Sequence, residues 1–165
     1  MKKQIVFFDM DNVLVDFPSA LELQEVKSLM PQYTLSDGTT HFDDIPGIFS
    51  HMKPMEGAVE AVKTIAQKYK VYILSTAPWH NPSAWSDKLE WVKRHFDSEE
   101  EGGVFYKRLI LSHHKDLCYR EDAYLIDDRP TKNGADRFGD NLLHFHKENG
   151  RFKTWNEVVE YLMNE

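Results

Sequence analysis

The chain has 165 residues, enough for one buried core with a small insertion, and its 41% hydrophobic and 28% charged residues are typical of a globular domain. Its net charge of −7 is spread along the chain, which argues against binding of polymeric nucleic acid in a basic groove. Small phosphorylated substrates could still bind, because a bound cation can reverse the local potential. The single cysteine excludes an internal disulfide and a paired-cysteine metal site.

The first predicted elements alternate between buried strands and amphipathic helices. Residues 4–9 and 71–74 are short apolar runs rich in β-branched and aromatic residues, as strands buried on both faces are. Between them, residues 56–69 place apolar side chains three or four positions apart, which predicts a helix. Another helix is predicted to begin at Pro82, because proline suits the first turn. Its expected apolar face comprises Trp85, Leu89, Val92 and Phe96.

The second half of the chain continues this alternation. Residues 109–111 and 123–126 are two further apolar runs that predict buried strands, and residues 141–145 are a candidate fifth strand. The last helix begins with a capping box, Thr154 followed three positions later by Glu157. Strands and helices that alternate through short connections predict an α/β fold, a parallel sheet with helices on both faces.

One long segment departs from the alternation. About forty residues separate the first strand from the helix at residue 56, many more than a strand-to-helix loop needs. Because this segment follows the carboxyl end of the first strand, where open α/β sheets bind ligands, it is expected to lie over that crevice as a small helical cap. The predicted division is therefore a core of residues 1–16 and 54–165 and a cap of residues 17–53.

Reactive side chains follow the predicted strands at their carboxyl ends. They are Asp9 and Asp11, Ser75 and Thr76, Asp127 and Asp128, and Lys115 a few residues beyond the strand at 109–111. Because parallel strands end at the same edge of a sheet, we expect these groups to converge on one site. Four carboxylates cannot stay ionised together in a small dry site without a cation, and oxygen ligands favour Mg²⁺. A lysine and two hydroxyls suit a phosphate group.

These clusters resemble the motifs of a known superfamily. Residues 8–16, FDMDNVLVD, resemble the first motif of the haloacid-dehalogenase-like (HAD) phosphatases, D-x-D-x-[TV]-[LV]. The Ser75–Thr76 pair, Lys115 and residues 125–128 resemble the second, third and fourth motifs, in the same order. Within the superfamily, residues 9–17, 54–62 and 125–130 are most similar to the 5′(3′)-deoxyribonucleotidases. That family usually has glycine in place of Asn12, and asparagine tolerates the backbone angles of such a turn.

The resemblance implies roles in catalysis and metal binding. Asp9 would attack phosphorus and form a phospho-aspartyl intermediate. Asp11 would protonate the leaving oxygen and then deprotonate the hydrolytic water. The Mg²⁺ cofactor would be held by Asp9, by Asp11 through its backbone carbonyl, and by Asp128, with Asp127 supporting or sharing that role.

The resemblance also implies how the substrate is held. Ser75, Thr76 and Lys115 would bind the phosphate, and Phe17 would stack near the nucleobase. Further candidates for base contacts are Trp79, Trp85, Phe42 and Phe49. The implied substrate class is the deoxyribonucleoside monophosphates, hydrolysed by a Mg²⁺-dependent phosphomonoesterase.

Three other interpretations of the sequence compete with this one. The chain could be a HAD phosphatase for another small metabolite, or a non-catalytic module that binds phosphate or accepts phosphorylation. Asp11 argues against the second, because an acceptor needs no acid/base. Histidine pairs at residues 113–114 and at 144 and 146 raise a zinc hypothesis, but a third ligand at readable spacing is missing.

The remaining expectations concern location and partners. No apolar run reaches membrane-spanning length, and the N-terminal residues lead into a strand without a signal-peptide cleavage site, so we expect a cytoplasmic protein without a membrane partner. The expected partner is a small phosphomonoester, and a homodimer is compatible with the sequence.

Overall fold

A five-stranded parallel sheet forms the centre of the computed structural model, which describes residues 2–165. Its order is β5-β4-β1-β6-β7, and every neighbouring pair is parallel. The strands are β1 (Ile5–Phe8), β4 (Lys70–Ser75), β5 (Leu109–Leu111), β6 (Ala123–Asp127) and β7 (Leu142–His144). All five predicted strands are confirmed to within one residue at either end, and so is the α/β class.

Three helices of the core follow the predicted positions. They are α2 (Ala58–Ile65), α3 (Pro82–His95) and α4 (Trp155–Asn164). The capping box of α4 is present, with Thr154 accepting from the backbone N–H of Glu157 and the Glu157 carboxylate accepting in return. Helix α2 is shorter than predicted because Gly57, at φ 79°, precedes it and turns follow it. Within residues 2–165 no helix is both long and apolar enough to cross a bilayer.

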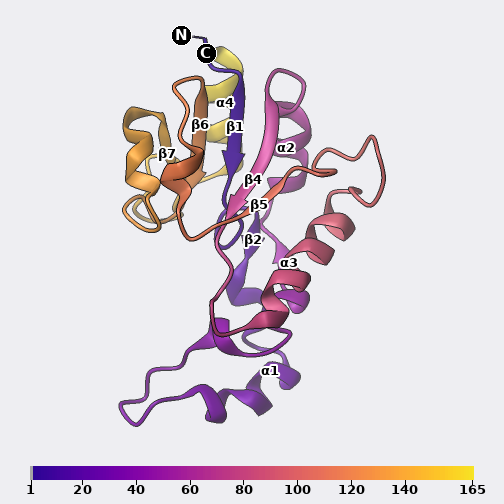
Figure 1. The fold of residues 1–165 in the computed structure, drawn as a ribbon, viewed down its shortest axis with the longest axis vertical. Helices are drawn as coiled ribbons and strands as arrows, with labels where there is room; N and C mark the ends of the chain where they lie inside the picture. The colour runs from indigo at the N-terminus through magenta and orange to yellow at the C-terminus, as the bar shows by residue number, and fades with distance from the viewer. Residues whose placement is uncertain (1) are drawn as a thin grey trace.

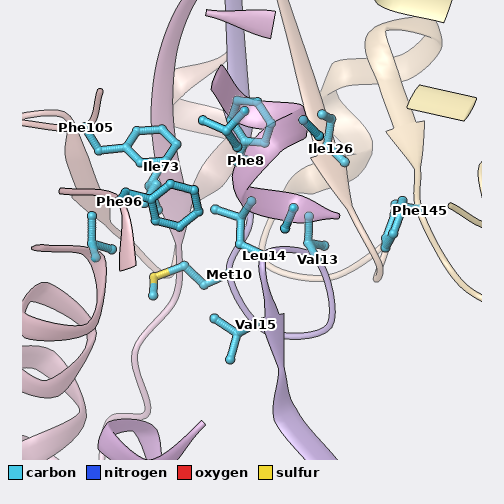
Figure 2. Close-up of a cluster of buried hydrophobic side chains, with 14 of the residues drawn as sticks. Phe8, Met10, Val13, Leu14, Val15, Ile73, Phe96, Phe105, Ile126 and Phe145 are labelled. Atoms are coloured by element: carbon cyan, nitrogen blue, oxygen red, sulfur yellow. The ribbon is translucent and has the colours of Figure 1, made fainter. Parts of the chain in front are cut away.

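The two faces of the sheet are covered by different elements. Val6 and Phe8 of β1 belong to the larger core, which includes the buried residues of α2 and α4. Figure 2 shows Phe8 within this core. Phe7, between Val6 and Phe8, packs on the opposite face against Phe138. Phe138 comes from the 3-10 turns Ala135–Asn141, so short turns pack on this face, whereas the general prediction from the sequence is of helices on both faces.

Helix α3 buries part of the predicted apolar face, Val92 and Phe96, but not all of it. Its buried residues are Ala84, Lys88, Trp91 and Val92. Leu89, which the sequence placed on the apolar face, is 42% exposed. The helix is therefore rotated so that Lys88, four residues after Ala84 and three before Trp91, points toward the core. That rotation brings a charge to the site described below.

The cap segment, residues 17–53, leaves the core through a two-stranded antiparallel stem. The stem consists of β2 (Val15–Asp16) and β3 (Lys53–Pro54). Beyond it lie helix α1 (Gln24–Leu29) and the 3-10 turns Phe17–Ala20, Met30–Tyr33, Phe42–Asp44 and Ile48–His51. Figure 1 shows this segment beyond the carboxyl tips of the strands, at the end of the molecule opposite the chain termini. The division at residues 17 and 53 stays a proposal, which the position of the stem supports.

Candidate active site

The chain turns sharply where β1 ends. The backbone N–H of Asp9 donates to Ile126 O at 3.0 Å, and the carbonyl of Met10 accepts from the N–H groups of Val13, Leu14 and Val15. Phe8 and Met10 are fully buried in the larger core (Figure 2), which fixes the backbone on either side of Asp9. Asn12 has φ 60°, so the expectation that asparagine supports this turn is confirmed.

The acidic pair after β6 lies beside Asp9. In the order β5-β4-β1-β6-β7 the connections reverse between β1 and β6, and such a switch point is where open sheets bind ligands. Carboxylate oxygens of Asp9, Asp127 and Asp128 lie within 4.8 Å of one another. Both oxygens of Asp127 accept hydrogen bonds, from Arg129 N at 2.9 Å and Lys115 Nζ at 2.5 Å. The buried Oδ1 of Asp128 has no protein partner.

Lys115 lies between two of these carboxylates. Its Nζ is 2.5 Å from Asp127 Oδ2 and 3.1 Å from Asp9 Oδ1, and the residue is 2% exposed. Burial acts to raise the pKa of Asp9, but the charges of Lys115 and Lys88 outweigh it and hold that pKa below its ordinary value. The lowered pKa favours the ionised form of Asp9, which is the form that its predicted role as a nucleophile requires.

Lys88 is the site residue that the sequence analysis missed. Its Nζ, fully buried, is 2.9 Å from Asp11 Oδ2 and 2.7 Å from the backbone oxygen of Thr76. It also donates to Ser75 Oγ at 3.4 Å. The signal that could have found it is its spacing on α3, between the buried Ala84 and Trp91. Lys88 thus supplies the positive charge on the side of the site formed by the first two motifs.

The carboxylates repel one another. Burial raises the pKa of Asp11, and the charge of Asp9 adds to that rise although Lys88 opposes it. Burial and the charges of Asp9 and Asp127 raise the pKa of Asp128 to about 7. A cation at this position would relieve the repulsion and give the unpartnered oxygen of Asp128 a partner. The group of carboxylate oxygens therefore fits a hard divalent cation.

The two hydroxyl residues after β4 point in different directions. Ser75 is 1% exposed, and its Oγ faces Lys88. The hydroxyl of Thr76 instead donates to Ser112 O at 2.8 Å, at the end of the neighbouring strand β5. The predicted phosphate contact of Thr76 would require that hydroxyl to turn away from Ser112. In this arrangement the Thr76 hydroxyl links the ends of β4 and β5, and the Ser75 hydroxyl faces the site.

The candidate aromatic residues divide into two groups. Phe17, at the end of the stem, packs edge-on against Phe49 with 5.9 Å between ring centroids, and Lys88 Nζ is 4.7 Å from the centre of the Phe49 ring. Phe49 is buried, while Phe17 and Phe42 are half-buried. Trp79 is 76% exposed and contacts His113, as does Trp85. Of the candidates, Phe49 therefore contacts the lysine of the site, and Phe17 contacts Phe49.

The histidines take other positions. Among residues 2–165 the grouped metal-ligating side chains are Asp9, Asp127 and Asp128, with no histidine among them. His144 Nε2 is 3.2 Å from the backbone oxygen of Asp128. His146 Nδ1 accepts from the N–H groups of Glu148 and Asn149. The 144/146 pair is therefore engaged in hydrogen bonds that hold loops.

Comparison with known proteins gives consistent matches. A family model described as "5' nucleotidase, deoxy (Pyrimidine), cytosolic type C protein" matches residues 3–164. A protein of Vibrio phage KVP40, named as a candidate 5′(3′)-deoxyribonucleotidase, is 46% identical over 163 residues, covering 99% of this chain and 86% of the phage protein. The mitochondrial 5′(3′)-deoxyribonucleotidase of Mus musculus is 28% identical over 79% of this chain and 67% of its own length.

The solved structures agree on the fold. A magnesium-bound protein of Bacillus subtilis described as the HAD-hydrolase YfnB superposes with a TM-score of 0.63, covering 98% of this chain and 99% of YfnB. Because the identity is 12%, this likeness concerns the fold alone. It confirms the predicted HAD-like architecture.

Proposed function

This chain belongs to the 5′(3′)-deoxyribonucleotidase family of HAD phosphatases, and we propose that its clustered carboxylates hydrolyse deoxyribonucleoside monophosphates with the help of Mg²⁺. The observation that carries the proposal is a pair of contacts at the switch point of the sheet: carboxylate oxygens of Asp9 and Asp128 lie within 4.8 Å of each other, and Lys88 Nζ lies 2.9 Å from Asp11 Oδ2. These groups come from the ends of β1 and β6 and from α3, far apart in sequence, and they offer both charges to a phosphate group.

The first half of the reaction uses Asp9 and Asp11. An oxygen of the ionised Asp9 attacks phosphorus, the bond to the ester oxygen breaks, and phosphorus stays on Asp9 as a mixed anhydride. The departing oxygen takes a proton from Asp11. The raised pKa of Asp11, caused by burial and by the charge of Asp9, keeps that proton available.

The second half regenerates the enzyme. Asp11, now ionised and paired with Lys88 at 2.9 Å, takes a proton from water, and the water oxygen attacks phosphorus. The bond between phosphorus and the Asp9 oxygen breaks, which releases inorganic phosphate and restores the Asp9 carboxylate. Lys88 would also contact the transferred group, because its Nζ lies 3.4 Å from the Oγ of Ser75, a predicted phosphate ligand. Lys115, whose Nζ lies 3.1 Å from Asp9 Oδ1, keeps the nucleophile ionised, and its predicted contact with the phosphate stays part of the proposal.

The metal would be held by Asp9 and Asp128. Asp128 is the direct ligand we favour over Asp127, because both oxygens of Asp127 already accept hydrogen bonds and Oδ1 of Asp128 accepts none from the protein. The backbone carbonyl of Asp11 is the proposed third protein ligand. When bound, Mg²⁺ neutralises the charge that gathers on the phosphate oxygens.

The choice of substrate is assigned to the cap segment. Phe17 stands where the stem meets the cap, and its contact with Phe49 connects it to Lys88. We propose that a nucleobase stacks near Phe17 while its phosphate lies at Asp9. The names of the relatives, which include deoxyribonucleotidases from a phage and a mouse, support this substrate class.

Phosphate release from a panel of substrates tests the proposal. With Mg²⁺ present, we expect kcat/KM for dUMP and dTMP to exceed that for sugar phosphates by about tenfold or more, since base contacts add binding energy. Equal values would contradict the nucleotide assignment and favour a phosphatase for another metabolite. The Asp11→Asn variant should lose at least about a hundredfold of its turnover of p-nitrophenyl phosphate, and unchanged turnover would remove Asp11 from the mechanism.

A further inference from the structure

A histidine on the edge strand β7 bonds to the loop that carries Asp128. His144 pairs in register with Asp127 across the β6–β7 ladder, and its ring reaches one residue further. Nε2 of His144 lies 3.2 Å from the backbone oxygen of Asp128. Because a carbonyl oxygen only accepts, the ring must donate from Nε2. The half-buried side chain of His144 therefore ties β7 to the residue whose carboxylate faces the metal position.

Besides the bond from Lys115 to Asp127 Oδ2, three hydrogen bonds hold the loop, and the one from His144 is made to Asp128 itself. Phe145 N donates to Asp127 O at 3.0 Å, and Arg129 N donates to Asp127 Oδ1 at 2.9 Å. Both of these bonds fix Asp127. In the residues that the structure describes, the bond from His144 is the side-chain contact that fixes the backbone of Asp128, whose buried Oδ1 has no protein partner. Without it the carboxylate would be free to swing with its peptide.

We propose that His144 is a positioning residue that presets the Asp128 carboxylate for metal binding. This inference rests on the proposed function, because it assumes that Asp128 binds Mg²⁺. Groups that orient a metal ligand without touching the metal commonly change metal affinity by about 10- to 100-fold when removed. The imidazole ring acts through its N–H and the length of its side chain. His146, two residues beyond the end of β7, cannot replace it, since its Nδ1 already accepts from the N–H groups of residues 148 and 149.

Calorimetric titration with Mg²⁺ alone, at pH 8, tests the proposal directly. His144→Phe keeps the size of the ring and removes the donor, so we expect the Mg²⁺ dissociation constant to rise about tenfold or more. His144→Gln places an N–H near the position of Nε2 and should stay within about threefold of the unsubstituted protein. His146→Gln is the matched control and should leave the constant unchanged. Equal constants for His144→Phe and the unsubstituted protein would overturn the inference.

A second measurement separates positioning from general damage to the fold. In His144→Phe, the Mg²⁺ concentration for half-maximal dUMP hydrolysis should rise about tenfold, while kcat at saturating Mg²⁺ stays within about twofold. A fall in kcat with an unchanged Mg²⁺ requirement would contradict the proposal. If His144→Phe does not fold, His144→Asn provides the test, because its donor is too short to reach Asp128 O and it should also weaken Mg²⁺ binding.

The outcomes for the unsubstituted protein distinguish this inference from the proposed function. If that protein binds Mg²⁺ and Asp128→Asn does not, while His144→Phe binds normally, the inference alone fails. If neither the unsubstituted protein nor any variant binds Mg²⁺, the proposed metal site fails and the inference fails with it.

Discussion

The core and the cap segment hold their functional groups in different ways. In the core, Asp9, Asp127 and Asp128 follow the ends of paired parallel strands, so the backbone ladder places them. The cap segment has one helix of six residues and several single turns, and it depends on side chains of the core for its position. The chemistry is therefore built on regular structure, and the part assigned to substrate choice is built on irregular structure.

The contacts between the two regions make this difference concrete. The buried amide of Asn81, at the start of α3, donates to Asp43 O at 2.8 Å and to Ile45 O at 3.1 Å. Ser83 Oγ accepts from Gly47 N, and Trp91 Nε1 donates to Met52 O at 2.9 Å. Each bond joins a core side chain to cap backbone. A substitution in the core should therefore affect chemistry, and one at this contact should affect the placement of the cap.

Asp9→Asn is expected to have the greatest effect on turnover. The substitution removes the attacking oxygen while keeping the size of the side chain, so kcat should fall by about 10⁴-fold or more. Stability should change little, because Lys115 keeps its ion pair with Asp127. Single-turnover phosphate release with dUMP measures the loss. Residual activity above a few per cent would contradict the role of Asp9.

Lys88→Met should reduce both turnover and stability. It leaves the carboxylate of Asp11 without its cation, and we expect kcat to fall by about 10²-fold and the free energy of unfolding by about 1–3 kcal/mol. Lys93→Met is the matched control on the same helix, because Lys93 pairs with Glu90 and Glu99 at the surface, where ion pairs contribute little. Denaturant unfolding and kinetics of both variants measure the difference; similar behaviour of the two would contradict the assignment of Lys88.

Asp128→Asn should change how metal and pH act on stability. The pKa of Asp128 is raised to about 7 by burial and by neighbouring carboxylates, above its ordinary value near 4. A raised carboxyl pKa means that the metal-free protein loses stability as the pH rises from about 4 through about 7. At pH 8 without Mg²⁺, the variant should therefore be more stable than the unsubstituted protein, by about 1 kcal/mol or more.

Thermal unfolding at pH 5.5 and pH 8, with EDTA or with Mg²⁺, measures this effect. Mg²⁺ should stabilise the unsubstituted protein more at pH 8 than at pH 5.5, because the cation competes with the proton for Asp128. It should stabilise the variant little at either pH. An Mg²⁺ effect that is independent of pH and survives in Asp128→Asn would show that the metal binds elsewhere.

Asn81→Ala should have the smallest effect on chemistry and act on the cap. The substitution leaves two backbone carbonyls of the cap without a hydrogen-bond donor. The free energy of unfolding should therefore fall by about 1–3 kcal/mol, and amide hydrogen exchange in residues 42–48 should become faster. Turnover of p-nitrophenyl phosphate should stay within about threefold, while KM for dUMP rises. Asn141→Ala, whose amide makes a single exposed contact with Glu121 O at 3.4 Å, is the control and should leave hydrogen exchange in residues 42–48 unchanged.

The core was predictable from the sequence because its signals are local. Short apolar runs such as residues 71–74 can be buried only as strands between covering layers, and carboxylates that follow such runs must share one edge. Lys88 escaped prediction because it interrupts an apolar pattern. Its burial depends on Asp11, which lies far away in the sequence and supplies the partner charge.

The cap was not predictable in the same detail. Its turns have no sustained period, and their positions depend on bonds such as those from Asn81, which pair one side chain with distant backbone. The hydroxyl of Thr76 illustrates the same limit. The sequence predicts a phosphate contact for it, and in the structure it donates to Ser112 O just beyond β5, an acceptor 36 residues away that the sequence does not reveal.

A crystal structure with Mg²⁺ and beryllium trifluoride would test most directly whether these groups form one site. We predict beryllium bonded to the Asp9 carboxylate, the cation in contact with Asp9 and Asp128, and Lys88 facing the fluorine atoms. Beryllium bonded to another residue, or a cation that contacts neither Asp9 nor Asp128, would contradict the account.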